Sequence, residues 1–286
     1  MKTVLETIQA GTGFLEKRGI EDARLNMEYL LAHVMGCRRL DLYMEFDRPL
    51  AEETLEPMRD LVRRRGAGVP LQHLTGSVEF CGRIFRSDAR ALIPRPETEQ
   101  LVEIALEETR NLGAGQVRVL DVGTGSGIIG LSLAAELAGE AAGVTLVDLS
   151  PDALSLAREN AESLQLAPDQ LTFVESDLFD EVTGRFDVIC ANLPYIATGE
   201  IESLSEEVKH DPSLALDGGQ QGTELMERFI DGLPGVLATP GFVIMEIGAG
   251  QESKLLASLK GIGLSGCKCV EDFAGIGRYL LAWRRE

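Results

Sequence analysis

The sequence predicts an α/β protein with a Rossmann-like, mainly parallel sheet that has an antiparallel edge, preceded by a small helical domain and a β-hairpin linker. From about residue 97 onward, short apolar runs alternate with helical sequence, which is typical of a parallel sheet covered on both faces. Before residue 75, apolar residues instead recur at helical spacing. We therefore divide the chain into a helical domain (1–75), a hairpin linker (76–92) and a sheet domain (93–286).

The elements follow from local signals. In the helical domain, Met27, Leu30 and Val34 form one apolar stripe, with Gly36 as the stop signal of that helix. His33 lies within this stretch and is interpreted as a packed side chain. Helices are expected at 4–19, 21–36, 51–66, 97–113, 128–139 and 151–166, and parallel strands at 117–123, 144–150, 171–176, 186–194 and 241–248. Two last strands, 267–273 and 278–285, are expected to pair antiparallel at the sheet edge.

Composition is that of an ordinary globular protein, with 44% hydrophobic and 26% charged residues among 286. The sequence shows neither a cationic, apolar leader nor an apolar run of about 18 residues, so we expect a cytoplasmic protein without membrane association. The five cysteines form no CxxC pair and no even disulfide framework. No metal site is expected.

Negative charge is concentrated after the helical domain. Residues 1–75 hold 11 Lys and Arg against 12 Asp and Glu, net −1, whereas residues 76–286 hold 16 against 34, net −18. Nucleic-acid binding normally depends on Lys and Arg that neutralise phosphates. Direct binding of nucleic acid by the sheet domain is therefore not expected, and the run Arg63-Arg64-Arg65 is interpreted as the basic end of a helix.

A glycine-rich turn joins the first strand of the sheet to its helix. The segment LDVGTGSGIIG passes through Gly123, Gly125 and Gly127, where bare backbone can approach a ligand and a helix N-terminus offers free N–H groups. Asp148, at the end of the next strand, suits the two hydroxyls of a ribose. Because Gly125, Gly127 and Gly130 also satisfy GxGxxG, the turn by itself indicates only an adenosine-containing ligand.

Asp121 precedes the turn in a DxGxGxG arrangement that resembles the S-adenosylmethionine loop of class I methyltransferases. That cofactor carries an ammonium group and no diphosphate, so an adjacent acid is favourable. Asp177 and Leu178, after the third strand, are candidates to flank the adenine. The predicted cofactor site comprises Gly123, Thr124, Gly125, Ser126, Gly127, Asp148, Asp177, Leu178 and Asn192.

The segment NLPY at the end of the fourth strand is similar to the (N/D)PPY loop of methyltransferases that modify planar amide or exocyclic amino nitrogens. The Asn192 side-chain oxygen and the Leu193 carbonyl can accept the two N–H bonds of such a nitrogen and orient its lone pair. Tyr195 can pack on the planar group, so Asn192, Leu193, Pro194 and Tyr195 form the predicted substrate site, with Asn192, Pro194 and Tyr195 as catalytic candidates. Leu193 replaces the usual first proline, at some loss of rigidity.

Six segments together resemble the PrmC (HemK) family of release-factor glutamine methyltransferases across essentially the whole chain: LTGSVEFCGRIF, LIPRPETEQLVE, DVGTGSG, NLPYI, EEVKHDPSLALDGGQQG and DFAGIGRYLLAWR. The resemblance implies a class I S-adenosylmethionine-dependent methyltransferase. It also implies that the enzyme methylates the side-chain amide nitrogen (N5) of the glutamine in the GGQ motif of class 1 peptide-chain release factors. The helical domain is then expected to dock the release factor, and the enzyme is expected to be a monomer.

Other interpretations remain open on the sequence. A ribosomal-protein glutamine is a close alternative substrate, and an adenine N6 nitrogen of nucleic acid is a more distant one. A nicotinamide-linked oxidoreductase and a non-catalytic adaptor are further alternatives. PRPETE is either a lid over the cofactor or a brace between domains, and Arg95 is either a site residue or a surface charge. Gly218-Gly219-Gln220 spells GGQ in the chain itself, but falls where the family has a glycine-rich loop.

Overall fold

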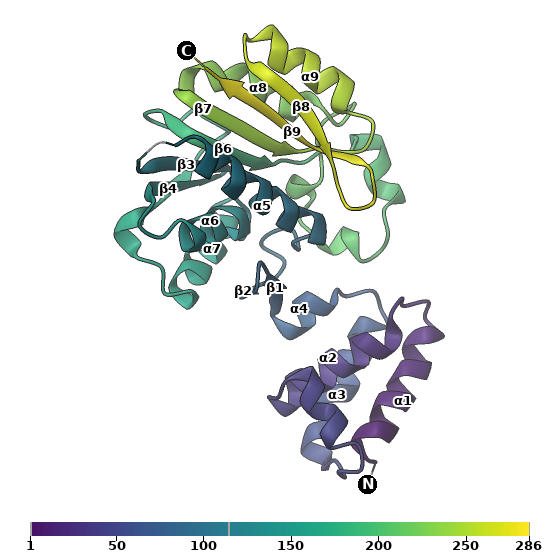
Figure 1. Ribbon diagram of the computed structural model, residues 1–286. Coiled ribbons are helices and arrows are strands. Elements are labelled where there is room, and N and C mark those ends of the chain that lie inside the picture. The colour runs from purple at the N-terminus through teal and green to yellow at the C-terminus, as the bar shows by residue number, and fades with distance from the viewer. Residues whose placement is uncertain (1, 114, 286) are drawn as a thin grey trace. The chain divides into compact units, whose positions relative to one another are not determined.

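The computed structural model describes residues 2–113 and 115–285, which form two compact units (Figure 1). Unit 1 comprises Met1–Ser77 together with Ser205–His210, and unit 2 comprises Val78–Leu204 and Asp211–Glu286. Among the described residues, helices long and apolar enough to cross a membrane are absent.

Unit 1 is a helical bundle around a single apolar core. The predicted second helix begins at Ala23 rather than Glu21, because Asp22 adopts a left-handed conformation with φ 47°. Gly36, with φ 63°, ends it as predicted. The helices are α1 (Val4–Glu16), α2 (Ala23–Met35), η1 (Arg39–Met44), α3 (Glu52–Arg65), α4 (Leu71–Thr75) and η4 (Val208–His210).

The positions of two side chains in unit 1 differ from what the sequence analysis expected. His33 is exposed, so the prediction that it packs in the core is wrong; it lies four residues after the half-exposed Tyr29, on the solvent side of α2. Arg65 is not simply a basic helix end, because it is 5% exposed. Its guanidinium donates to Asn26 Oδ1 at 2.7 Å and to Glu207 Oε2 at 2.7 Å, which holds three segments of the unit together.

Unit 2 contains a seven-stranded sheet in the order β5-β4-β3-β6-β7-β9-β8. The first five of these strands are parallel, and β9 pairs antiparallel with both β7 and β8. The predicted parallel sheet with an antiparallel edge is therefore confirmed. The strands are β3 (Val117–Val122), β4 (Ala141–Asp148), β5 (Leu171–Glu175), β6 (Phe186–Asn192), β7 (Leu237–Glu246), β8 (Ser265–Glu271) and β9 (Gly277–Arg284).

Helices cover both faces of this sheet (Figure 1). Val117 and Val119 of β3 pack in the core shared with α5 and α6, whereas Leu120 and Val122 pack in the core shared with α8 and α9. This alternation along one strand is what a sheet buried on both faces requires. The helices of unit 2 are α5 (Pro96–Asn111), α6 (Ile128–Glu136), α7 (Pro151–Ser163), η2 (Pro168–Gln170), η3 (Thr198–Ser203), η5 (Ser213–Ala215), α8 (Glu224–Val236) and α9 (Glu252–Gly261).

The predicted hairpin is formed by β1 (Ser77–Phe80) and β2 (Arg83–Arg86). Its two-residue turn has positive φ at both Cys81 and Gly82, the conformation that suits a tight hairpin. Phe80 and Phe85 are buried in the core under α5 and α6. The hairpin is thus packed against the sheet layer of unit 2.

Asn160 on α7 ties this hairpin to the glycine-rich turn. Its side chain is fully buried, its Oδ1 accepts the Arg86 N–H at 2.7 Å, and its Nδ2 donates to the Ser126 carbonyl at 2.9 Å. The same Nδ2 also donates to the Arg86 carbonyl at 3.3 Å, so a single amide holds three backbone groups from two segments that are distant in the sequence.

We expect Asn160→Ala to lower the free energy of unfolding of unit 2 by about 2–4 kcal/mol, because it removes the partner of the buried Ser126 carbonyl and of the part-buried Arg86 N–H. Urea denaturation followed by fluorescence measures the change. Glu162→Ala, on the exposed side of the same helix, is the matched control and should change the value by less than about 0.5 kcal/mol. Equal losses in both variants would contradict the role of Asn160.

Candidate functional site

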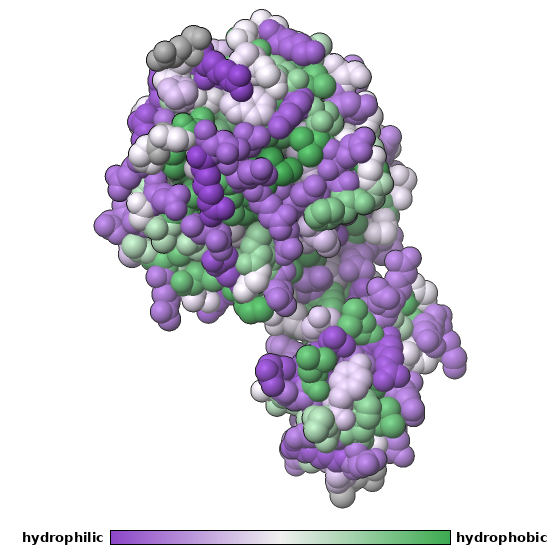
Figure 2. Space-filling model, in the orientation of Figure 1, coloured by the Kyte–Doolittle hydropathy of each residue, from purple (hydrophilic) through white to green (hydrophobic). Residues whose placement is uncertain are grey.

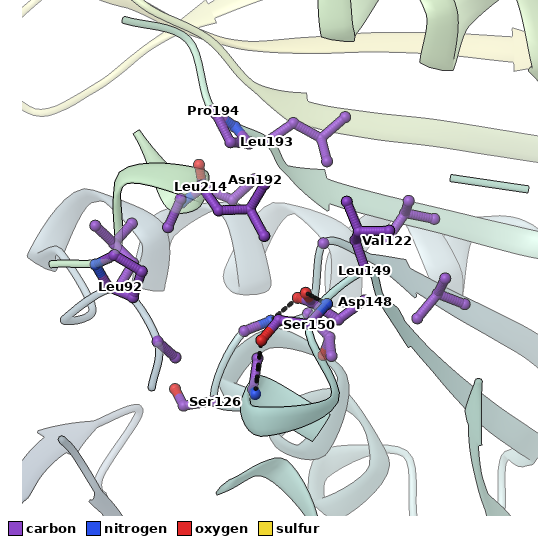
Figure 3. Close-up of a pocket in the computed structure, with 18 of the residues that line it drawn as sticks. Leu92, Val122, Ser126, Asp148, Leu149, Ser150, Asn192, Leu193, Pro194 and Leu214 are labelled. Carbon is purple, nitrogen blue, oxygen red and sulfur yellow. Dashed lines mark hydrogen bonds between the residues drawn. The ribbon is translucent and has the colours of Figure 1, made fainter. Parts of the chain in front are cut away.

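A pocket lies at the carboxyl ends of β3, β4 and β6. The chain enters the sheet at β3, proceeds outward through β4 and β5, and then returns to the other side of β3 as β6. Ligands of open α/β sheets bind at such a reversal of strand order. Figure 3 shows Asn192, Leu193 and Pro194 together on one side of the pocket and Asp148 and Ser150 on another.

The predicted site residues are brought together, with two exceptions. Gly127 and Tyr195 do not line the pocket as the described residues form it, although both directly adjoin residues that do. Residues of the predicted set that line it are Gly123, Thr124, Gly125, Ser126, Asp148, Asp177, Leu178, Asn192, Leu193 and Pro194.

The glycine-rich turn is shaped by positive φ values at Gly123, Gly125 and Gly127, which are 70°, 55° and 84°. A Cβ on Gly123 would lie 2.7 Å from Leu193 Cδ2, and a Cβ on Gly127 would lie 2.8 Å from Leu131 Cδ1. Both close approach and conformation therefore require glycine at these two positions. Gly127 closes the turn beneath the pocket, where its N–H donates to the Thr124 carbonyl at 2.8 Å.

Asp148 holds the turn from the end of β4. Its Oδ2 accepts the Gly125 N–H at 2.8 Å and its Oδ1 accepts the Ser150 N–H at 2.9 Å. Burial raises the pKa of this carboxyl, and the backbone hydrogen bonds oppose that rise. Each carboxylate oxygen can accept more than one hydrogen bond, so Asp148 is fixed in place and still able to bind hydroxyl groups in the pocket.

Asp121 lies behind the turn rather than in the pocket. It is fully buried, and its Oδ2 accepts the Thr124 hydroxyl at 2.5 Å and the Gly130 N–H at 2.9 Å. Burial raises the pKa of this carboxyl to about 6. The acid that the sequence places beside a cofactor ammonium thus fastens the turn to α6, and it does not line the pocket.

Asp177 and Leu178 follow β5 and line the pocket as predicted. Leu178 has φ 51°, an uncommon conformation for a branched residue. Asp177 Oδ2 accepts from Arg228 at 2.8 Å. The carboxylate is therefore partly engaged on α8, while the Leu178 side chain contributes apolar lining.

The Asn192 side chain is held by two residues outside the predicted site. Its Nδ2 donates to Thr98 Oγ1 at 3.2 Å and to Glu246 Oε2 at 3.1 Å. The Thr98 hydroxyl in turn donates to Glu246 Oε2 at 2.8 Å. The amide nitrogen therefore faces both acceptors on one side, which turns the Oδ1 atom to the other.

Leu193 and Tyr195 anchor the NLPY loop through different contacts. Leu193 is 4% exposed and packs against Gly123, so its side chain joins the NLPY loop to the glycine-rich turn. The Tyr195 ring packs on the core under α8 and α9, and its carbonyl accepts from Gln251 Nε2 at 2.9 Å. Burial raises the pKa of the Tyr195 hydroxyl. Its role as a platform for the substrate stays a prediction.

The PRPETE segment borders the pocket through Pro94, Arg95 and Thr98. Arg95 Nη2 lies 3.2 Å from Asp211 Oδ2, and the Ile93 N–H donates to the same carboxylate. Thr98 and Glu246, which bind Asn192, are among the site residues that sequence reasoning did not include. The available signal for Glu246 was an ionisable residue at the end of the apolar run GFVIME, whereas Thr98 was recognisable only as part of a helix start.

The GGQ segment within the chain supports the NLPY loop. Gly218 donates its N–H to the Ile196 carbonyl at 2.9 Å, and Ile196 pairs with Asp217 as an isolated bridge. A Cβ on Gly218 would lie 2.6 Å from the Pro194 carbonyl oxygen and 2.9 Å from Tyr195 Cα. Gln220 is exposed. The two glycines therefore have a packing role beside the site.

Comparison with known proteins identifies both parts of the chain. Residues 6–76 match the PrmC N-terminal domain family, and residues 114–253 match a methyltransferase domain family. The release factor glutamine methyltransferase of Geobacter sulfurreducens is 38% identical over 96% of this chain and 95% of its own length. The release factor glutamine methyltransferase of Rhodopirellula baltica is 41% identical over 97% of this chain and 95% of its own length.

Solved structures show the same fold. The 16S rRNA methyltransferase RsmC of T. thermophilus, in complex with AdoMet and guanosine, matches with a TM-score of 0.51 and 19% identity. The match covers 73% of this chain and 50% of that one. At this identity the likeness concerns the fold, which is that of S-adenosylmethionine-dependent methyltransferases.

We expect Gly218→Ala to reduce the rate of methyl transfer by roughly 10-fold or more, because the added methyl group displaces the Pro194 and Tyr195 backbone and a small misplacement of reacting groups is costly. Initial rates at saturating substrate measure the effect. Gly199→Ala, where an added Cβ meets nothing within 4 Å, is the matched control and should keep wild-type activity. Full activity in Gly218→Ala would show that the loop tolerates displacement.

Proposed function

The chain belongs to the family of release factor glutamine methyltransferases, and we propose that its substrate is the GGQ glutamine of class 1 peptide-chain release factors. The enzyme uses S-adenosylmethionine and methylates the side-chain amide nitrogen (N5). The observation that carries the proposal is the Asn192 amide, whose nitrogen donates to Thr98 and Glu246 so that its oxygen is left for a ligand.

The residues present fit the cofactor. Gly123 and Gly125 line the pocket with bare backbone, a Cβ on Gly125 would meet only Ala91, at 3.7 Å, and the Asp148 carboxylate is held beside this backbone. We assign the ribose hydroxyls to Asp148 and the adenine to the neighbourhood of Asp177 and Leu178. When bound, S-adenosylmethionine supplies an electrophilic methyl group on a sulfonium.

The NLPY loop then has the task of making a poor nucleophile react. The lone pair of a carboxamide nitrogen is delocalised, and the nitrogen becomes positively charged as a new bond forms. Two oxygen acceptors, Asn192 Oδ1 and the Leu193 carbonyl, can bind its two N–H groups, which orients the nitrogen and stabilises the developing charge. The proton is lost from the product to water, so the site needs no histidine or cysteine.

Charges around the pocket favour a protein over a nucleic-acid substrate. Its two lining arginines are already paired, Arg90 with Asp88 and Glu159 and Arg95 with Asp211. They are therefore not available to neutralise a phosphate backbone. We further propose that the enzyme acts in the cytoplasm, as a monomer, without direct contact to nucleic acid.

Transfer of labelled methyl groups from S-adenosylmethionine to a purified release factor tests the proposal. We expect label on the GGQ glutamine, located by mass spectrometry, and none when that glutamine is replaced by alanine or when the enzyme carries Asn192→Ala. Ribosomal proteins and protein-free rRNA are offered in parallel. Label that persists in the alanine substrate, or that appears preferentially on a ribosomal protein or rRNA, would reassign the substrate.

Unit 1 carries an exposed apolar surface of its own, formed by residues of η1: Leu40, Tyr43 and Met44 are 66%, 43% and 88% exposed. The visible face of this unit shows apolar side chains among polar ones (Figure 2). The buried Glu28 holds η1 in place, because its carboxylate accepts from Arg39 Nη1 at 2.8 Å and from the Tyr43 hydroxyl at 2.9 Å. We propose that this firmly held surface docks the release factor away from its GGQ loop.

Replacement of Leu40 and Met44 by serine is expected to raise KM for a release factor roughly 10-fold, because truncating central apolar anchors of an interface costs about 1–2 kcal/mol. KM for a short GGQ peptide should not change, since the peptide cannot reach a separate docking surface. Ile84→Ser, an exposed apolar residue of β2 at 59%, is the matched control. A parallel rise for protein and peptide would argue against docking by unit 1.

A further inference from the structure

We infer that Glu246 and Thr98 are positioning residues that determine which atom of the Asn192 amide faces the substrate. The inference deepens the proposed function and rests on it. Asn192 and Glu246 are register partners on β6 and β7, and Thr98 approaches them from the first turn of α5. Thr98 and Glu246 are 0% and 2% exposed, so the three side chains meet in a buried cluster at one edge of the pocket.

Every hydrogen bond of the cluster has a fixed direction. An ionised carboxylate only accepts, so Glu246 must receive both the Thr98 hydroxyl and an Asn192 N–H. The Thr98 hydroxyl hydrogen is donated to Glu246, which leaves Thr98 Oγ1 as a second acceptor beside the Asn192 amide nitrogen. Rotating the amide by 180° would instead place Oδ1 beside the Glu246 carboxylate, which has no hydrogen to donate. The oxygen of Asn192 is therefore directed to the substrate side.

The segments that carry Thr98 and Glu246 are themselves held in place by further contacts. Pro94 restricts the backbone before α5 and Pro96 restricts its first residue, and the Thr98 N–H donates to the Arg95 carbonyl at 3.0 Å. Tyr279, the register partner of Glu246 on β9, donates its hydroxyl to the Glu97 carbonyl at 2.6 Å. The PRPETE segment thus joins the sheet next to Asn192, which gives it a role in aligning the reacting group.

Protonation of Glu246 should disturb this alignment. Burial raises the pKa of the Glu246 carboxyl to about 6, opposed by the hydrogen bond from Thr98. The charged groups that act on it are Arg278 and Arg95, which lower this pKa, and Glu97, which raises it; the Tyr195 and Tyr279 hydroxyls also feel its charge. The aligned, ionised form is present above that pKa and is lost as the pH falls through it.

An exchange of functional groups separates alignment from a merely structural role. Asn192→Asp alone places two carboxylates next to each other. Glu246→Gln alone introduces an amide that can donate to the Asn192 oxygen, so that the N–H groups of Asn192 turn toward the substrate. In the double variant the introduced amide donates to the introduced carboxylate. One oxygen at position 192 is then again free to accept from the glutamine.

We expect each single change to lower kcat about 100-fold with little change in KM or in the Kd of S-adenosylhomocysteine measured by calorimetry. The double variant should recover at least about 10-fold over the product of the two single effects, in line with couplings between contacting residues. Losses that simply multiply would overturn the inference. Methylation of the release factor by the wild-type enzyme tests the proposed function separately. A failure of the proposed function can therefore be distinguished from a failure of this inference.

Thr98 and the pH profile provide the second measurement, which does not depend on the double variant folding. Thr98→Val should lower kcat and Thr98→Ser should restore it, because only serine keeps the hydroxyl. The acidic limb of the pH profile of kcat, near pH 6, should be absent in Glu246→Gln. Its loss would show that the limb reports the titration of Glu246 and not that of Asp121. Equal activity of the valine and serine variants, or an unchanged acidic limb, would contradict the inference.

Discussion

The orientation of one amide group is the constraint on which the rest of this site depends. An asparagine side chain has an acceptor and a donor end of nearly equal size, and only the acceptor end can bind the N–H groups of a glutamine. The buried Glu246 carboxylate removes the ambiguity, since its negative charge admits only the donor end. A costly buried charge is thus retained next to the pocket, where it is hydrogen-bonded by Thr98 and Asn192.

Two loops that approach the pocket from different strands depend on each other. Leu193 of the NLPY loop fills the space over Gly123 of the glycine-rich turn, so the half that we assign to the glutamine and the half that we assign to the cofactor share one packing contact. Asp121 fastens the turn from below and Gly218 supports the NLPY loop from outside. Rigid mutual support of this kind is what positioning catalysis requires.

Most of the fold and half of the site could be predicted because their signals are local. Apolar runs that end in glycine or polar residues predicted the strands of the sheet, and the turn around Gly125 indicated where the pocket lies. Contacts between distant segments could not be predicted in this way: Thr98, Asn192 and Glu246 meet only because the register of β6 with β7 and the start of α5 bring them together. His33 failed for a related reason, since an apolar neighbourhood in sequence does not say which side of α2 faces the core.

The replacement of a proline by Leu193 shows how rigidity can be supplied by packing instead of by a ring. A proline at this position would fix φ, whereas the Leu193 side chain is 4% exposed between the two loops. Three residues further on, the Ile196 N–H donates to the Leu216 carbonyl and the Ile196 carbonyl accepts the Gly218 N–H. The carbonyl of Leu193 thus lies in a segment anchored at both ends, so the loss of the ring need not loosen it as an acceptor.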